Sequence, residues 1–265
     1  MPSVSNIAIG ANMAAAAANK ARHGMNESIA RLSTGMRAMY GADAAGHSMG
    51  KSIQAVGASY AQASRNIEDG ISYAQMGESV LLEVANLGSR LRELGIAYDN
   101  AALLDANQEA ALDAEAALIG DTIQNILDTT DFNTVEVVDS NSATQKAIAY
   151  GSLTANTTNV GPNVQIAVTN TISTANAADT AADTLLASVA KGLGNIAADL
   201  TALKAFQGAA SATGANMAAA GARLIDTDFA LETASLTKNA ILNQAALAMA
   251  AQANAAQSSI LSVLQ

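Results

Sequence analysis

The sequence predicts a mainly α-helical protein: a long, folded-back helical coiled-coil rod with a small β-hairpin or meander in the middle and paired N- and C-terminal helices. Half of the 265 residues are hydrophobic, yet only 3% are aromatic and Trp is absent, so the usual large anchors of a globular core are missing. Apolar residues recur at helical spacing over stretches far longer than an ordinary globular helix. Both ends are uncharged, since the first charged residue is Lys20 and the last 27 residues carry no charge. Long helices that pack closely through small side chains fit these observations.

Each uncharged end contains one apolar stripe at helical spacing. The N-terminal stripe consists of Ile7, Ala11, Ala14, Ala18, Met25, Ile29, Leu32 and Met36. The C-terminal stripe consists of Leu242, Ala246, Met249, Ala253, Ala256, Ile260 and Leu264. The opposite face of the C-terminal helix is polar but uncharged, with Asn243, Asn254, Ser258 and Gln265. Both stripes are too poor in large side chains to hold a lone helix, so we expect them to pair with each other and with further copies of the chain.

The helical pattern continues between the two ends. An apolar face runs from about residue 43 to 100, which predicts a coiled-coil rod. Asp105 followed by Gln108 predicts a capping box that opens the next helix, and this helix ends before the segment DTTDFN. A further apolar stripe between residues 186 and 203 repeats the pattern in the second half.

Only the stretch from about 135 to 170 has a different character. Its short β-branched runs, TVEVVD, KAIAYGSL and NVQIAVTNTIS, are separated by Asn, Ser, Gly and Pro. We therefore expect a small hairpin or meander inserted between helices that fold back alongside one another. Its Asn, Thr and Ser residues predict a segment that faces outward and tolerates change.

Composition excludes several classes of function. A net charge of −10 and a pI near 4.5 argue against sequence-independent nucleic-acid binding, which needs a basic face. With no cysteine, the chain forms neither disulfides nor thiolate metal sites. The Asn, Gln and Ser residues of the uncharged ends exclude a membrane span, because their desolvation in lipid would outweigh the gain from a few Leu and Ile. The first residues also lack the basic and apolar regions of a cleaved secretory signal.

The sequence offers little support for catalysis or for cofactor binding. His23 and His47 are the only histidines, and neither has a second ligand at the spacing of a metal site. The segment GLGNIA, residues 192–197, matches a dinucleotide fingerprint in letters but lies inside a helical stripe and does not follow a strand. No G-x-S-x-G nucleophile elbow occurs. We therefore expect no enzymatic activity, no cofactor and no metal.

Several motifs in the same order carry a resemblance to a known family. They are RLSTGMRAMYGADAAG (31–46), ASRNIEDGISYAQMGESVLLEV (63–84), RLRELGIAYDN (90–100), RLIDTDFALETASLTKNAILNQAALAMAAQAN (223–254) and the final SILSVLQ. These stretches resemble the N- and C-terminal halves of bacterial flagellin, over about residues 1–134 and 175–265. The resemblance implies a secreted, extracellular structural subunit that polymerises into the helical flagellar filament for swimming, after export unfolded through the flagellar type III pathway.

The resemblance also implies a domain organisation and a set of partners. Residues 1–42 and 223–265 correspond to inner-tube helices, 43–134 and 175–222 to the outer-tube rod, and 135–174 to a short variable surface segment. The implied partners are further copies of the chain, an export chaperone, and the hook-filament junction and cap proteins. Inner-tube packing would fall on Ile7, Met25, Ile29, Leu32, Met36, Leu242, Met249, Ile260 and Leu264. The lumen would be lined by Asn243, Asn254, Ser258 and Gln265.

Departures from the family pattern and two alternatives also bear on this interpretation. AMYGADAAG is one residue shorter than the usual segment and has Asp43 alone where two acids are usual; Thr134 replaces a frequent Gly, and Gln265 a frequent Arg. A hook-filament junction protein shares terminal patterns of this kind, although the match of RNIEDGISYAQ favours flagellin. A non-flagellar secreted coiled-coil oligomer is the other alternative. An inserted hydrolase domain is excluded, because about 35 to 50 central residues are too few.

A final feature concerns innate immunity. The segment RLRELGIA and Glu115 resemble the surface that the flagellin-sensing Toll-like receptor binds, with Arg90, Leu94 and Glu115 at the matching positions. Arg supplies several donors, Leu an apolar contact and Glu a charge partner, which is the composition of a compact hot spot. Ordinary rod packing with solvated charges would explain the same residues.

Overall fold

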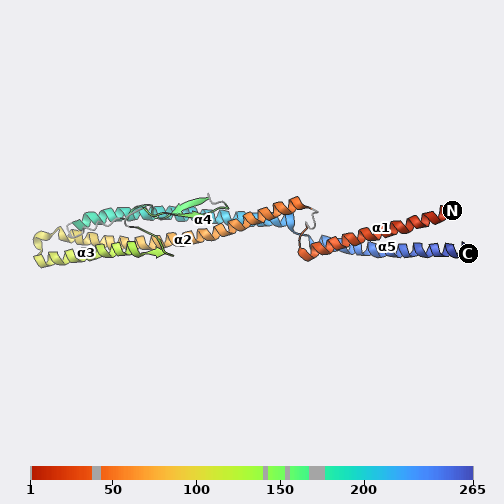
Figure 1. The fold of residues 1–265 in the computed structure, drawn as a ribbon. Coiled ribbons are helices and arrows are strands. Elements are labelled where there is room, and N and C mark those ends of the chain that lie inside the picture. Colours follow the sequence, from red (N-terminus) through yellow and green to blue (C-terminus); the bar gives the residue numbers. More distant parts are fainter. Residues whose placement is uncertain (1, 38–42, 140–142, 153–155, 167–176, 265) are drawn as a thin grey trace. The chain divides into compact units, whose positions relative to one another are not determined.

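The computed structural model describes the chain except residues 1, 38–42, 140–142, 153–155, 167–176 and 265. The described chain is mainly helical and contains two small antiparallel strand pairs, as the sequence predicts. Its long helices are α1 (Pro2–Thr34), α2 (Ala44–Tyr98), α3 (Ala106–Thr129), α4 (Ala178–Ile225) and α5 (Phe229–Leu264), with a short 3-10 helix, η1 (Ala101–Leu103) (Figure 1). The strands are β1 (Asp131–Phe132), β2 (Val135–Glu136), β3 (Lys146–Ala149) and β4 (Thr157–Val160). None of the described helices is both long and apolar enough to cross a membrane.

The chain divides into two compact units. The terminal unit consists of Met1–Ala55 and Met217–Gln265, and the middle unit of Val56–Asn216. Helices α2 and α4 contribute to both. In the terminal unit, α1 and α5 lie side by side, with the N- and C-termini at the same end of the pair (Figure 1). The expected pairing of the terminal helices is thus confirmed.

Local sequence explains where the shortest of the long helices begins. The Asp105 carboxylate accepts hydrogen bonds from the backbone N–H groups of Asn107 and Gln108, at 2.8 and 2.9 Å. The Gln108 side chain in turn accepts from the Asp105 N–H at 3.0 Å. The predicted capping box is therefore present, and it satisfies donors that the first turn of α3 would otherwise leave open.

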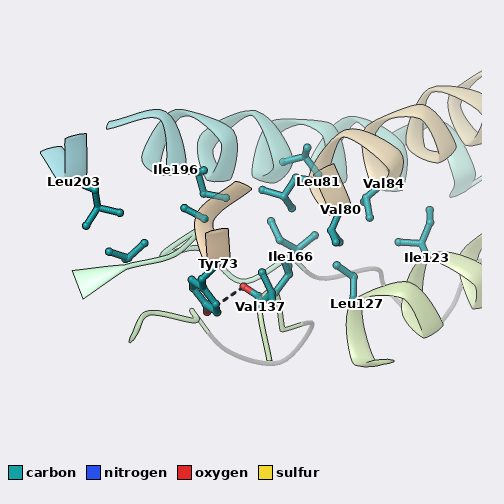
Figure 2. Packing of buried hydrophobic residues seen from close by; sticks show 14 of the residues in the cluster. Tyr73, Val80, Leu81, Val84, Ile123, Leu127, Val137, Ile166, Ile196 and Leu203 are labelled. Carbon is teal, nitrogen blue, oxygen red and sulfur yellow. Dashed lines mark hydrogen bonds between the residues drawn. The ribbon is translucent and has the colours of Figure 1, made fainter. Parts of the chain in front are cut away.

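The core of the middle unit lies where α2, α3, α4 and the segment after α3 meet. Leu81 and Val84 of α2, Ile123 and Leu127 of α3, and Ile196 and Leu203 of α4 are almost completely buried (Figure 2). A smaller cluster, with Leu91, Leu94, Ala116, Ala178 and Ala182, continues this packing. A Cβ added at Gly95 would lie 2.5 Å from the Asp179 backbone nitrogen, so glycine is needed at this close contact between α2 and α4.

The central segment does more than face outward. Val137, Val138, Val160 and Ile166 are fully buried in the same core as the helices, which the prediction of a surface segment did not include. The Tyr73 hydroxyl donates to the carbonyl of Glu136 at 3.0 Å, and the Gly161 N–H donates to the Asp199 carboxylate at 3.0 Å. This part of the chain therefore packs on the helices and helps to form the core of the middle unit.

Candidate assembly surface on the terminal helix pair

The seam between α1 and α5 is built from small and polar side chains. On α1 the buried residues are Ala14, Ala18, Ala21 and Ser28. On α5 Glu232 and Ala246 are buried, and Asn239, Asn243, Ala250, Ala253 and Gln257 are half-buried between and beyond them. Successive positions in each set are three, four or seven residues apart, which is the spacing of a coiled-coil seam. Small side chains let the two helices approach closely along most of the seam, and Met25 and Leu32 are half-buried at the same spacing towards the end of α1.

The large apolar side chains of this unit lie mostly outside the seam. Leu242 and Ile29 are both 49% exposed and Met249 is 67% exposed within the single chain; the resemblance assigns all three to inner-tube packing. On α1 and α5, the exposed apolar set consists of Ile9, Met13, Ile29, Phe229, Leu231, Ile241, Leu242, Leu247 and Met249. Of the other predicted packing residues, Met25, Leu32 and Met36 are half-buried. The side chains of Ile7, Ile260 and Leu264 lie outside the described residues.

Two open hollows lie beside the helix pair, along the N-terminal part of α1 and the C-terminal part of α5. One, of about 480 Å³, is lined by residues that include Ala17, Ala21, Leu242 and Ala246. The other, of about 470 Å³, is lined by Gly10, Ala248, Met249, Gln252, Ala253 and Ala256. Each hollow is large enough for several side chains. The two helices by themselves therefore leave their shared surface incompletely packed.

The residues expected to face a lumen divide into two groups. Asn254 and Ser258 are exposed on α5, as a lumen position requires. Asn243 differs, because it is half-buried and its Oδ1 is buried with no hydrogen-bond partner among the described residues. Asn243 therefore lies on the seam side of α5, against α1. Gln265 lies outside the described residues.

The chain segments that join these helices to the rest of the unit pair with each other. Met36 and Asp226 form an antiparallel β-bridge, the Arg37 N–H donates to the Ile225 carbonyl at 2.7 Å, and the Thr227 N–H donates to the Gly35 carbonyl at 2.9 Å. The Gly35 backbone has a φ of 69°, a left-handed conformation that glycine adopts without strain. We call this pairing of 35–37 with 225–227 the connector bridge.

A single acid serves the connector where the family pattern has two. One oxygen of Asp43 accepts from the Gly46 N–H at 2.9 Å and so caps α2, while the other accepts from the Arg37 guanidinium at 3.1 Å. The same Arg37 nitrogen donates to the Leu224 carbonyl at the end of α4, also at 3.1 Å. Asp43 and Arg37 thus link the start of α2 to the end of α4 within the terminal unit.

The middle unit carries the residues of the predicted receptor surface. The Arg90 guanidinium on α2 donates to the Glu115 carboxylate on α3 at 2.7 and 2.9 Å, and to Glu93 at 3.0 Å. The hydrogen bond to Glu115 has the larger effect, and with the hydrogen bond to Glu93 it raises the pKa of Arg90. The Arg90 and Glu115 side chains are 50% and 44% exposed. Leu94 is only 3% exposed and packs in the smaller core cluster, so it is not available as the expected apolar contact.

Charge is distributed unevenly between the two units. Of the 23 acidic and 13 basic residues, 18 acidic and 6 basic residues lie in the middle unit, which therefore carries a net charge of −12. The terminal unit holds the remaining 5 acidic and 7 basic residues, a net charge of +2. Among the described residues, no group of three or more metal-ligating side chains is placed to hold an ion. The exposed feature of the terminal unit is therefore its apolar side chains.

Comparison with known proteins identifies the family. The family model for the bacterial flagellin N-terminal helical region matches residues 5–143, and that for the C-terminal helical region matches residues 180–264. The flagellin of Halalkalibacterium halodurans is 32% identical over 256 residues, which cover 90% of this chain and 91% of that protein. The flagellin of Bacillus subtilis is 28% identical over 280 residues (90% and 92%), and a flagellar filament core protein of Brachyspira hyodysenteriae is 28% identical over 267 residues (91% and 92%). With both flagellin helical regions present and flagellins similar to it along nine-tenths of its length, this chain belongs to the bacterial flagellin family and is a structural subunit of the flagellar filament.

Proposed function

We propose that the chain polymerises with further copies of itself through the terminal helix pair, and that the resulting filament is the extracellular propeller for swimming. The observation that carries this proposal is the placement of side chains on α1 and α5. The seam within one chain uses small residues, whereas the exposed apolar set remains in contact with water. Burying a Leu or Met side chain completely is worth roughly 1.5 to 3 kcal/mol, so several half-exposed ones per subunit supply a substantial driving force.

A second copy of the chain is the occupant that fits this surface best. The lining of the hollows beside α1 and α5 is mostly Ala, Gly, Leu and Met, with Lys20, Lys238, Asn239 and Gln252 also present, so mainly apolar side chains would fill them. The same helices carry such side chains outward, including Ile9, Met13, Leu231 and Ile241. Asn254 and Ser258, exposed and uncharged, would then line the lumen, where they would neither attract nor repel passing charged chain strongly.

Electron microscopy of the purified chain, seeded with filament fragments, tests this proposal. We expect long helical filaments from the wild type and none from Met249→Asp, because an unpaired charge buried between subunits costs several kcal/mol per copy. Leu103→Asp is the control, since Leu103 is 85% exposed in η1 of the middle unit. Discrete rings or caps would favour the hook-filament junction alternative, and small oligomers a secreted coiled coil. Normal filaments from Met249→Asp would contradict the proposal.

Export through the flagellar type III pathway and the associated partners belong to the same proposal. A chain without cysteine forms no disulfide that would resist unfolding before export. The exposed apolar set would also need cover before assembly, which gives an export chaperone a surface on α1 and α5. Contacts with the hook-filament junction and cap proteins would use this same surface at the two ends of the polymer.

Recognition by the flagellin-sensing Toll-like receptor is the second candidate function. The exposed Arg90–Glu115 pair is the observation that favours it, whereas Leu94 would act only by supporting α2 from within the core. We expect Arg90→Ala to reduce the response of receptor reporter cells to soluble chain. Arg65→Ala is the control, because Arg65 is exposed on α2 outside this segment. Equal responses from wild type and Arg90→Ala would rule out this surface.

A further inference from the structure

The half of the α1–α5 seam next to the connector bridge contains two specific contacts. Arg31 Nη1 lies 3.6 Å from the Glu232 carboxylate, and the two side chains are 28% and 12% exposed. Seven residues earlier in α1 and seven later in α5, Gly24 lies against Asn239, whose amide nitrogen would be 2.7 Å from a Cβ at Gly24. The two contacts are one heptad apart on both helices, so they belong to one antiparallel register.

The other half of the seam keeps this register without specific contacts. One further heptad brings Ala17 and Ala246 to the same hollow, and the next brings Gly10 and Ala253 to the second hollow. The side chains at these four positions are small and nonpolar. Sliding by one heptad would place alanine or glycine against alanine again, at little cost. Asn243 also lies on this half of the seam, but its buried Oδ1 has no hydrogen-bond partner among the described residues, so the observed register gains nothing from it. This half of the seam therefore contributes little to specifying its own register.

The Arg31–Glu232 pair, by contrast, discriminates sharply between registers. If α5 slid by one heptad, Arg31 would face either Asn239 or the segment before α5, and Glu232 would face either Gly24 or a position beyond Thr34, the last residue of α1. Glu232 is buried, and its Oε1 has no hydrogen-bond partner among the described residues, so Arg31 supplies its nearby opposite charge. A buried pair adds little net stability over apolar side chains, but leaving one charge uncompensated is strongly unfavourable.

We propose that Arg31 and Glu232, supported by the contact of Gly24 with Asn239, specify the register in which the N- and C-terminal helices pair, and that the small-residue half of the seam takes its register from them. This inference rests on the proposed function, because the register decides which large side chains α1 and α5 present together to neighbouring copies. A subunit paired one heptad out of register would present a different pattern to its neighbours and would be excluded from a regular helical polymer.

Cysteine cross-linking can read the register directly, since the chain has no cysteine of its own. Ala18→Cys with Ala246→Cys reports the observed register, because both residues are buried in the seam. Ala18→Cys with Ala253→Cys reports a shift of one heptad. In wild-type background, we expect sedimented filaments to form the first cross-link almost exclusively.

Replacing the ion pair by apolar side chains of similar length separates specificity from stability. In the Arg31→Met, Glu232→Met double variant, we expect the helices to remain paired, but the ratio of in-register to shifted cross-link to fall about tenfold or more. Filaments should become irregular or shorter. Arg31→Met alone, which leaves Glu232 without its cation, should reduce polymer yield further than the double variant does. The control is His23→Gln with Glu27→Gln, which removes an exposed contact of 3.3 Å within α1 and should change neither ratio nor yield.

The connector bridge offers a competing source of register. Its hydrogen bonds hold residues 35–37 against 225–227 regardless of side chains. If the bridge alone were sufficient, the double variant would retain the wild-type cross-link ratio and regular filaments, and this result would overturn the inference. If wild-type chain forms no polymer at all, the proposed function fails instead. The cross-link ratio is then measured in the soluble full-length chain. The inference is supported if the in-register cross-link predominates in wild type and no longer predominates in the double variant.

Discussion

The stability of the middle unit depends on pH in the alkaline range through Tyr73. Burial of its ring and then the nearby charge of Glu136 raise the pKa of Tyr73 to about 12. Because the folded-state pKa lies above the ordinary value of 10, the folded chain holds this proton more tightly than the unfolded chain does. The associated stability is present below pH 10 and is lost as pH rises from 10 to 12, by about 2 to 3 kcal/mol. Chemical denaturation at pH 8 and pH 11.5 measures this loss.

Tyr73→Phe should separate this proton from the rest of the alkaline response. At pH 8 the variant should lose about 1 to 2 kcal/mol, because the carbonyls of Glu136 and Val137 lose their buried donor. Between pH 10 and 12 its stability should decline less steeply than that of the wild type. Tyr98→Phe at the end of α2 is the control. Parallel pH profiles for wild type and Tyr73→Phe would show that the hydroxyl does not titrate with unfolding.

Asp199 has the same linkage sign as Tyr73, but in the acidic pH range. Burial raises the pKa of Asp199, and the hydrogen bond from the Gly161 N–H offsets only part of this effect. The folded chain therefore binds this proton more tightly than the unfolded chain, so ionisation of Asp199 lowers stability as pH rises through the acidic range. Asp199→Asn keeps an oxygen that can accept from Gly161 and removes the charge. We expect a slightly higher denaturation midpoint at pH 7 and no difference from wild type at pH 2.

Asp199→Ala tests the hydrogen bond itself. The Gly161 N–H is buried, so removing its acceptor should lower stability by about 1 to 2 kcal/mol at pH 7. If the Asn and Ala variants had the same midpoint, the contact would contribute nothing to holding residues 160–166 on α4. The comparison therefore distinguishes the cost of the charge from the benefit of the acceptor.

At the scale of single helices, substitutions at two glycines are expected to have opposite effects on stability. A Cβ at Gly77 of α2 would lie 3.1 Å from both Ile196 and Val137, whereas a Cβ at Gly194 of α4 would meet no atom within 4 Å. Gly77→Val should therefore destabilise the middle unit by about 1 to 3 kcal/mol through overpacking. Gly194→Ala should stabilise it by roughly 0.5 to 1 kcal/mol, because alanine is the better helix former. Thermal melts of the two variants check both signs, and a neutral Gly77→Val would mean that α2 and α4 can separate at this point.

The segment that contains the strands has buried residues that are needed for folding and a loop that should tolerate insertions. Val160 and Ile166 are fully buried, but the loop between β3 and β4 begins at exposed or half-buried positions around Gly151 and Asn156. We expect a short tag inserted beside Asn156 to leave filaments intact, and Ile166→Asp to unfold the middle unit. Electron microscopy of the tagged chain and a melt of the Asp variant measure the two outcomes. Loss of assembly from a folded, tagged monomer would place this loop among the subunit contacts.

The sequence predicts the positions of the helices in this chain better than it predicts which face of each helix is buried. The helices and the Asp105 capping box follow from spacing and local chemistry, which do not depend on distant residues. The seam of α5 follows only in part, because the predicted stripe contains Ala246 and Ala253, which lie in the seam, but also Leu242 and Met249, which are exposed. A hydrophobicity pattern assigns the largest side chains to the seam, whereas close approach of two helices selects the smallest. Val137 and Val138 were missed for a related reason, since both are buried although strand alternation predicts one face.

At the scale of the whole chain, the excess acidic charge lies in the middle unit, whereas the terminal unit is nearly neutral. The middle unit holds the excess of acid, which keeps it solvated and makes copies repel one another. The terminal unit, nearly neutral, carries the exposed apolar set. Salt should therefore promote assembly by screening the middle units without weakening the apolar contacts of the terminal helices. This division of roles explains how an acidic chain can end in uncharged helices.

The last prediction concerns when those helices become ordered. Ordering the 33 residues of α1 and the 36 of α5 costs roughly 1 to 2 kcal/mol of backbone entropy per residue, and a seam of Ala, Asn and Ser returns little apolar burial to offset it. We therefore expect the pairing of α1 with α5 to be fully populated only in the polymer, where neighbouring copies cover the exposed apolar set. Limited proteolysis of monomer should remove roughly the first 40 and last 40 residues and leave a middle unit that melts normally but no longer polymerises. Filaments should resist cleavage at both ends. Protected termini in the monomer would instead mean that the seam and the connector bridge suffice to fold the terminal unit, and that assembly joins helices that are already formed.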